Sequence, residues 1–217
     1  MKVFASIVMI LVIVVAVVAG GPVMAFIQDC TGNNTTTFQV SSGSWMTIGN
    51  WDNGRPDETI CAVIPAGKTV NVPEDASAAC KTLTMQVSGS TRSTLSLDKN
   101  ATLKLGDGGT LTSYLNGDLV IGGDAAPVAH LRIDGVHTIN GSGGTIKVKH
   151  KGDIIPHTDG NDKLILTGDT GCSGYPDSRD CSLTLYGDGF GKVPLDNRAF
   201  VMALEGSTLH LDTYDMT

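Results

Sequence analysis

Aromatic and charged residues are scarce in this chain of 217 residues. Aromatic residues make up 5% of it, and Asp, Glu, Lys and Arg together make up 17%. Coiled coils and long-helix proteins need far more Glu, Lys and Arg, so the composition excludes that class. The 22 acidic and 15 basic residues give a formal net charge of −7, which argues against nucleic acid as a partner. Disorder is excluded as well, because 41% of the residues are hydrophobic and can form a core.

The motifs of several common enzyme classes are also missing. The sequence contains no G-x-S-x-G, no H-E-x-x-H and no G-x-x-x-x-G-K-[ST], which mark many serine hydrolases, zinc proteases and P-loop proteins. It has no C-x-x-C pair and no histidine at zinc-ligand spacing from a cysteine, so its cysteines do not read as a zinc site. The sequence therefore says more about location and fold than about a reaction.

The first 25 residues are predicted to be a secretory signal peptide. Lys2 precedes an uncharged apolar run over residues 3–19, then a Gly-Gly-Pro break and small residues before a cut after Ala25. If it stays uncleaved, the segment 3–27 is nearly long enough to act as a membrane anchor, and only then do we expect a membrane partner. In both cases the rest of the chain is expected to be secreted, extracellular or at the cell surface.

The cysteines agree with export, because disulfides are the usual state of cysteines in an oxidising compartment. Cys172 and Cys181 bracket a short Gly/Pro/Ser/Asp-rich loop and are predicted to pair. Cys61 and Cys80 are expected to form the second pair. Three states of Cys30 then stay open: a free thiol, a disulfide between two chains, or a disulfide with a cysteine beyond Thr217.

A short unit recurs along the chain, in which two aliphatic residues alternate with polar ones. This period of two indicates half-buried β-strands. Glycine, Asn-Gly or Asp-Gly separates the units, and the chain has 27 glycines in all, as expected for turns. The clearest copies are Thr82–Met85, Thr94–Leu97, Thr102–Leu105, Asp118–Ile121, His130–Ile133, Thr145–Val148, Lys163–Leu166, Ser182–Leu185 and Thr208–Leu211.

The pattern predicts an all-β protein whose single domain is a right-handed parallel β-helix or β-solenoid, with a β-sandwich as the alternative. Glycine corners, many short aliphatic strands and few aromatics favour stacked coils over hairpins. We expect a signal peptide at 1–25, a polar leader or N-terminal cap at 26–43, and the solenoid at 44–217. The best helix candidate, Glu74–Lys81, is long enough for little more than one turn.

The two ends of the strand ladder carry distinctive motifs. The first runs from Gly43-Ser44-Trp45 through Trp51 and Gly54-Arg55-Pro56 to the segment Val63-Ile64-Pro65-Ala66-Gly67-Lys68-Thr69-Val70. It resembles the opening of the G8 domain, which occurs in secreted β-helical proteins, including cell-surface hyaluronan-degrading proteins and their microbial relatives. The strands Cys181–Gly187 and Leu204–Leu211 are similar to that family's closing strands. They depart from it at Glu205-Gly206-Ser207, where a glycine pair is usual.

The resemblance covers about Trp45 to Leu211 and implies a secreted β-helix. It does not supply catalytic residues for this chain. If the chain is active, the resemblance implies metal-dependent cleavage of a polysaccharide. Family members are usually longer, with further β-helix after this domain.

Two tryptophans and one polar cluster are the candidate site residues. Trp45 and Trp51 could form a platform that stacks on sugars, although an apolar plug at the end of the solenoid is the favoured interpretation. The densest polar cluster lies in a gap between strands, where function is often found. It offers His150, His157 and Asp159 as acid–base groups and Asp153, Asp159 and Asp162 as ligands for a divalent cation such as calcium. A solvated loop of turn-forming residues explains the same cluster without any function.

Three functions follow from these observations. The first is a secreted module for surface or matrix adhesion or glycan binding, non-catalytic on its own, whose partner is an extracellular polysaccharide. The acidic charge favours neutral or calcium-bridged glycans, unless a basic patch of Lys147, Lys149, Lys151 and Lys163 attracts anionic ones. The second is the N-terminal part of a polysaccharide-degrading, hyaluronidase-like enzyme. The third is a structural surface protein that self-associates end to end into fibres.

Overall fold

The computed structural model describes residues 34–123, 127–157 and 162–168, and beyond them the strands β18 to β22. Apart from 3-10 turns such as η2 (Ile48–Asn50), the regular elements in this part are β-strands. Three large sheets contain only parallel pairs, whereas β7 (Val87–Ser88) and β8 (Thr91–Arg92) form a small antiparallel hairpin. The fold is therefore a parallel β-solenoid, as predicted, and not a β-sandwich of antiparallel hairpins.

Each large sheet collects one strand from successive coils of the chain. The first sheet contains β1 (Thr35–Thr37), β3 (Cys61–Ile64), β6 (Leu83–Met85), β11 (Thr110–Leu115), β14 (Val136–Gly141), β17 (Lys163–Gly168) and β20 (Leu195–Arg198). The second contains β2 (Ser42–Ser44), β4 (Thr69–Val72), β9 (Thr94–Leu97), β12 (Asp118–Ile121), β15 (Thr145–Val148), β18 (Thr184–Gly187) and β21 (Phe200–Ala203). The third contains β5 (Ser77–Cys80), β10 (Thr102–Leu105), β13 (Ala129–Ile133), β16 (Gly152–Pro156), β19 (Phe190–Gly191) and β22 (His210–Leu211).

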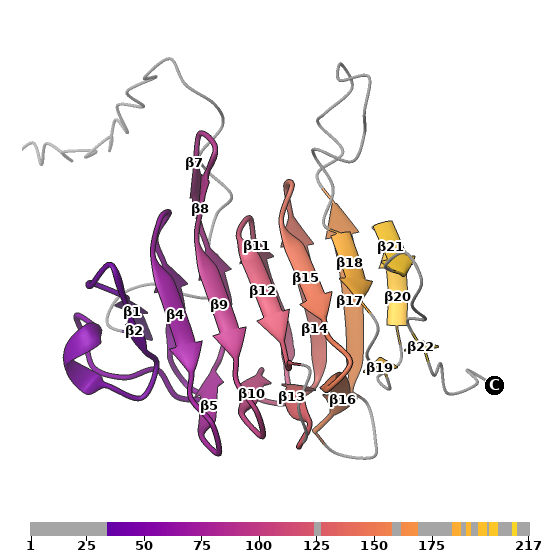
Figure 1. Cartoon of the computed structure of the whole chain (residues 1–217), viewed down its shortest axis with the longest axis horizontal. Coiled ribbons are helices and arrows are strands. Elements are labelled where there is room, and N and C mark those ends of the chain that lie inside the picture. The colour runs from indigo at the N-terminus through magenta and orange to yellow at the C-terminus, as the bar shows by residue number, and fades with distance from the viewer. Residues whose placement is uncertain are drawn as a thin grey trace, which may run out of the picture.

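From β4 on, the chain passes through the sheets in a constant order, second, third and then first, before it starts the next coil (Figure 1). One coil takes roughly 25 residues, within the range typical of solenoid repeats. Thr69, for example, pairs with Thr94 one coil later. Neighbouring coils therefore place corresponding residues side by side, and each row of side chains runs along the solenoid axis.

The core consists of the inward rows of the three sheets. In the second sheet, one row is Val70, Leu95, Leu119 and Ile146, and all four side chains are buried. These residues alternate along each strand with polar residues that face outward. Aliphatic side chains thus fill the narrow interior, which explains why the chain needs few aromatic residues.

One inward row of the first sheet includes a polar side chain, that of His137. His137 lies between Leu111 and Leu164 and is fully buried. Its Nε2 lies 2.7 Å from Oγ of Ser113, and this oxygen also accepts a hydrogen bond of 2.8 Å from the backbone N–H of Leu83. Burial lowers the pKa of His137 to about 4, although the charge of Asp107 acts in the opposite direction. A side chain this deep in the core is a structural element and cannot reach a substrate.

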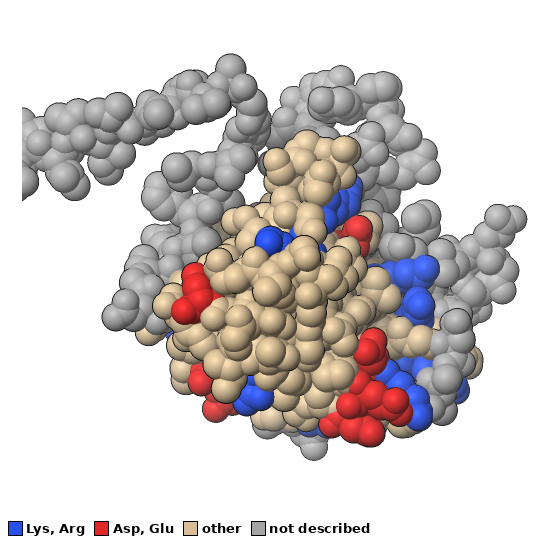
Figure 2. Space-filling view, turned by 60° about the vertical axis from the view of Figure 1, so that its left-hand side comes forward, with Lys and Arg blue, Asp and Glu red and all other residues tan. Residues whose placement is uncertain are grey.

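The N-terminal end of the core is closed by aromatic side chains. Trp51 packs edge-on against Phe38 and Trp45, with ring centroids 5.1 and 4.9 Å apart, and its Nε1 donates to the Trp45 carbonyl at 3.0 Å. With this end turned forward, Figure 2 shows mostly uncharged residues over it and charged side chains around its edge. Strands β1 and β2 already belong to the sheets, so the described part of the predicted leader, residues 34–43, forms part of the solenoid.

Among the described residues, no helix has the length and apolar character needed to cross a membrane. The predicted signal segment, residues 1–25, and the predicted anchor, residues 3–27, lie outside the described part of the chain.

Candidate functional site

The outward surface of the third sheet carries hydroxyl, imidazole and cationic side chains on neighbouring strands. Strands β10, β13 and β16 pair in parallel, which sets their outward residues in two rows. We call this surface the third-sheet face. Its rows are Thr102, His130 and Asp153, and next to them Lys104, Arg132 and Ile155.

His130 and Asp153 face each other across adjacent coils. Nδ1 of His130 contacts Oδ1 of Asp153. The Asp153 side chain is only 7% exposed, whereas His130 is 27% exposed. An ionised carboxylate only accepts hydrogen bonds, so Nδ1 is the donor in this pair and the carboxylate fixes the orientation of the ring. Nε2 is then the nitrogen that is free to meet a ligand.

Lys104 and Arg132 lie side by side on β10 and β13 but differ in their partners. Nζ of Lys104 pairs with Asp134 at 2.7 Å and with Glu58 at 2.8 Å. Burial acts to lower the pKa of Lys104, but hydrogen bonds to Asp134 and Glu58 outweigh it and raise that pKa. Nε of Arg132, in contrast, is buried without a hydrogen-bond partner.

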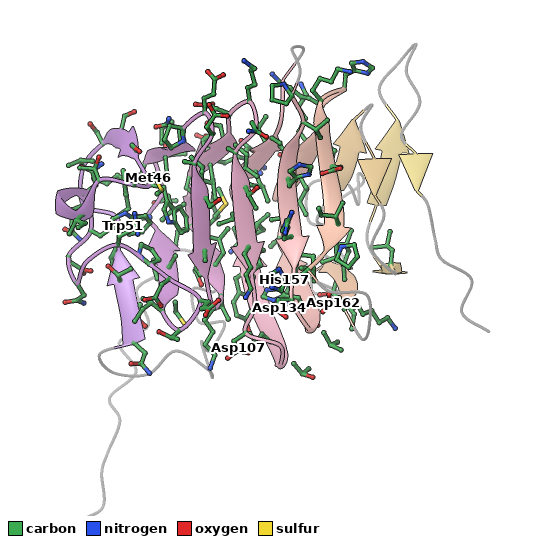
Figure 3. All side chains as sticks on the ribbon, turned by 90° about the horizontal axis from the view of Figure 1, so that it is seen from below. Met46, Trp51, Asp107, Asp134, His157 and Asp162 are labelled. Carbon is green, nitrogen blue, oxygen red and sulfur yellow. The ribbon has the colours of Figure 1, made fainter. Side chains whose placement is uncertain are left out.

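A line of acidic residues follows the corner between the third and first sheets. Asp107 follows β10, Asp134 follows β13, and Asp162 precedes β17. Figure 3 shows Asp134, His157 and Asp162 close together, with Asp107 beside them. The same corner thus carries an acidic side chain on successive coils.

These corner carboxylates hold the backbone and pair with lysines. Oδ1 of Asp162 accepts a hydrogen bond of 2.7 Å from the backbone N–H of Gly135, one coil earlier. Asp107 lies 3.3 Å from Nζ of Lys81 and accepts from the backbone N–H of Gly109 at 3.1 Å. Their hydrogen bonds serve the fold, and they do not form an open acidic cluster.

The structure separates the two histidines of the predicted acid–base cluster. His150 lies in the turn before β16, and His157 follows the other end of that strand. An extended segment of this length spans about 20 Å, so the two imidazoles cannot act on one bond. The third candidate, Asp159, lies outside the described residues.

The predicted metal ligands are divided in the same way. Asp153 contacts His130 on the third-sheet face, Asp162 holds the corner, and Asp159 is not described. Within the described ranges, no group of three or more His, Cys, Asp or Glu side chains has an arrangement that would hold a metal ion. The described part of this cluster therefore does not support the calcium hypothesis.

The tryptophans do not form a sugar-stacking platform. Trp45 is 0% exposed and Trp51 is 4% exposed, so neither ring offers a face to a ligand. Their burial agrees with the interpretation as an apolar plug.

The predicted disulfide between Cys61 and Cys80 does not form. Cys80 is a free, fully buried thiol, and burial raises its pKa. It points into the core from the third sheet, in register with Leu105, whereas Cys61 begins β3 in the first sheet and is disulfide-bonded. Cys30 and the predicted pair Cys172 and Cys181 lie outside the described residues.

The four lysines of the predicted basic patch do not share one surface. Lys147 faces outward from β15 in the second sheet, whereas Lys163 begins β17 in the first. Lys149 and Lys151 lie in the turn between β15 and β16.

Sequence reasoning missed His130, Arg132 and Lys104 as site residues. In the sequence they are only the polar positions of separate strand units. The register between neighbouring coils, which a single sequence does not show directly, is what brings them together. Aligning Thr102 with His130 and His130 with Asp153 would have placed the histidine beside the carboxylate.

No protein-family model matches the chain, and the comparisons with curated proteins and with solved structures found no match either. The resemblance to the G8 domain therefore stays a prediction, which rests on the motifs at the two ends of the strand ladder.

Proposed function

We propose that this protein is a secreted or cell-surface β-solenoid module that binds an extracellular polysaccharide along its third-sheet face, without being catalytic on its own. The observation that carries the proposal is the pair of outward rows headed by Thr102 and Lys104, which continue without interruption over three coils. They present hydroxyl, imidazole, ammonium and guanidinium groups, all of which exchange hydrogen bonds with sugar hydroxyls.

The spacing of the coils supports a polymeric ligand. Neighbouring parallel strands lie about 4.8 Å apart, which is close to the length of one sugar unit in an extended polysaccharide. A chain laid along the solenoid axis would therefore meet an equivalent position on each coil, as in other repeat proteins that bind extended ligands. The aromatic plug closes the N-terminal end of the core and leaves the sides of the solenoid as the binding surfaces.

Two matched threonine variants test where the glycan binds. Thr102 starts β10 on the third sheet and Thr94 starts β9 on the second, and both are half-buried, outward-facing residues. In a panel of neutral and acidic oligosaccharides, we expect Thr102→Gln to weaken binding roughly tenfold, because the longer side chain intrudes on the row. Thr94→Gln should bind like the wild type. Equal effects of the two substitutions, or no binding by the wild type, would refute the proposal.

The contact between His130 and Asp153 favours one alternative, the N-terminal part of a polysaccharide-degrading enzyme. A neutral imidazole that donates from Nδ1 to a carboxylate has Nε2 free as a general base. In that case, oligosaccharides should be shortened by the wild-type protein, and His130→Gln should abolish the cleavage while His150→Gln leaves it unchanged. An unaltered size distribution with the wild type, with and without divalent cations, would rule out the enzyme.

A further inference from the structure

On the third-sheet face, one cationic side chain, Arg132, has no carboxylate partner among the described residues. Lys104 and Arg132 are neighbours in register, yet both carboxylates at this point, Asp134 and Glu58, pair with Lys104. Within the described ranges, no ion pair involves Arg132, and its Nε is buried without an acceptor. Two cations side by side on adjacent strands repel each other, so the uncompensated guanidinium is a site that a ligand anion would stabilise.

His130 lies on the same side of β13 as Arg132, because residues two apart on a strand share a face. The other groups around His130 are Asp153 on β16 and Thr102 on β10. Asp153 accepts from Nδ1, so a neutral imidazole has a lone pair at Nε2 and repels an anion. With a second proton at Nε2, the ring donates from both nitrogens, to Asp153 on one side and to the ligand on the other.

We propose that Arg132 and His130 form an oxyanion-binding site on the third-sheet face, which takes a carboxylate, sulfate or phosphate group carried by the ligand and binds it together with one proton at Nε2 of His130. The proposal rests on the proposed function and specifies the chemical class of its ligand. The guanidinium supplies planar paired donors that match two oxygens of such a group. Asp153 stabilises the imidazolium that forms when the proton is taken up.

The net charge of −7 does not oppose this site, because charges on a protein surface are largely screened beyond about 8 Å at physiological salt. Binding of an anion depends instead on which nearby carboxylates each cationic side chain already pairs with. Lys104 has two carboxylates, His130 has one, and Arg132 has none among the described residues. A bound anion would give Arg132 the ion-pair partner that it lacks among the described residues.

Calorimetry with galacturonate, galactose, inorganic sulfate and inorganic phosphate tests the site. Galactose matches galacturonate except for the carboxylate, and the two inorganic ions reveal a site that needs no sugar. We expect galacturonate to bind more tightly than galactose, and Arg132→Met to weaken galacturonate binding roughly tenfold. Arg132→Lys should fall in between, because it keeps the charge but loses the planar donors. Lys149→Met removes one positive charge from the turn between β15 and β16 and should have no effect.

Proton uptake gives an independent readout. Binding enthalpies in buffers of different ionisation enthalpy should reveal that galacturonate binds with a proton, and His130→Gln should abolish the uptake while circular dichroism confirms the fold. Equal binding of galactose and galacturonate, or an unchanged affinity in Arg132→Met, would overturn the proposal. If longer neutral glycans still bind in either case, the proposed function stands without this site. If no glycan binds but sulfate or phosphate does, the oxyanion site stands and the proposed function fails.

Discussion

Acidification from pH 7 to pH 4 should cost the folded protein about 3 kcal/mol through His137 alone. Burial lowers the pKa of this imidazole from 6.5 to about 4, so the unfolded chain binds the proton more readily than the folded one. The stabilisation is fully present above pH 6.5, declines as the pH falls towards about 4, and is lost below that value. The cause is the fully buried position of the ring, whose Nδ1 has no hydrogen-bond partner.

His137→Leu isolates this effect. Leucine continues the inward row between Leu111 and Leu164, and Ser113 keeps its hydrogen bond from the backbone N–H of Leu83. Urea unfolding at pH 7 and pH 4 should give a loss of stability that is smaller in His137→Leu than in the wild type by about 3 kcal/mol. His150→Gln, an exposed control, should behave like the wild type. Parallel losses in His137→Leu and the wild type would contradict the buried neutral histidine.

Replacing Gly122 with alanine should destabilise the protein by at least about 3 kcal/mol. Gly122 turns the chain after β12 with φ +79°, and a Cβ there would lie 2.1 Å from the carbonyl oxygen of Lys151 on the next coil. Alanine rarely adopts that φ, and the obstructing atom is backbone, so the two coils would have to move apart. The melting temperature is expected to fall by roughly 10 °C for a chain of this size.

Gly123→Ala is the matched control for this substitution. Gly123 is the next residue, its φ is not in the left-handed region, and nothing lies within 4 Å of the Cβ that alanine would add. Its effect should stay within about 0.5 kcal/mol. Equal melting temperatures for the two variants would show that the coils do not stack as closely at this corner as the structure has them.

The strand ladder could be predicted because each coil repeats the same local pattern. The units Thr94–Leu97, Thr102–Leu105, Asp118–Ile121 and Thr145–Val148 coincide with β9, β10, β12 and β15. Their period of two depends only on which side of the strand is buried, and that information is local. The parallel stacking then followed from glycine at the corners and from the scarcity of aromatics.

The predicted disulfide between Cys61 and Cys80 failed because the sheet that each cysteine joins decides where it points. Ser77–Cys80 is strand β5, within the segment Glu74–Lys81, the best helix candidate of a chain predicted to be all-β, and it pairs with β10. The same pairing turns Cys80 into the core and away from Cys61. Neither result can be read from spacing along the chain, because both depend on which sheet each residue joins.

The third-sheet face could not be predicted for a related reason. The distance along the chain from Thr102 to His130 is not the same as that from His130 to Asp153, since the turns between strands differ in length. A single sequence with unequal coils does not reveal the register. The His130–Asp153 contact, and an Arg132 that forms no ion pair with a described residue, appear only once the coils are stacked.

The most direct test of the central claim is the dependence of affinity on ligand length. The ligand is a glycan that binds in the oligosaccharide panel, prepared as oligomers from one sugar unit upward. Calorimetry should show that affinity rises with each added unit until the oligomer spans the coils of the third-sheet face. Thr102→Gln should reduce this gain. A monosaccharide that binds as tightly as the longest oligomer would contradict binding along the solenoid axis, and so would a length dependence that Thr102→Gln leaves unchanged.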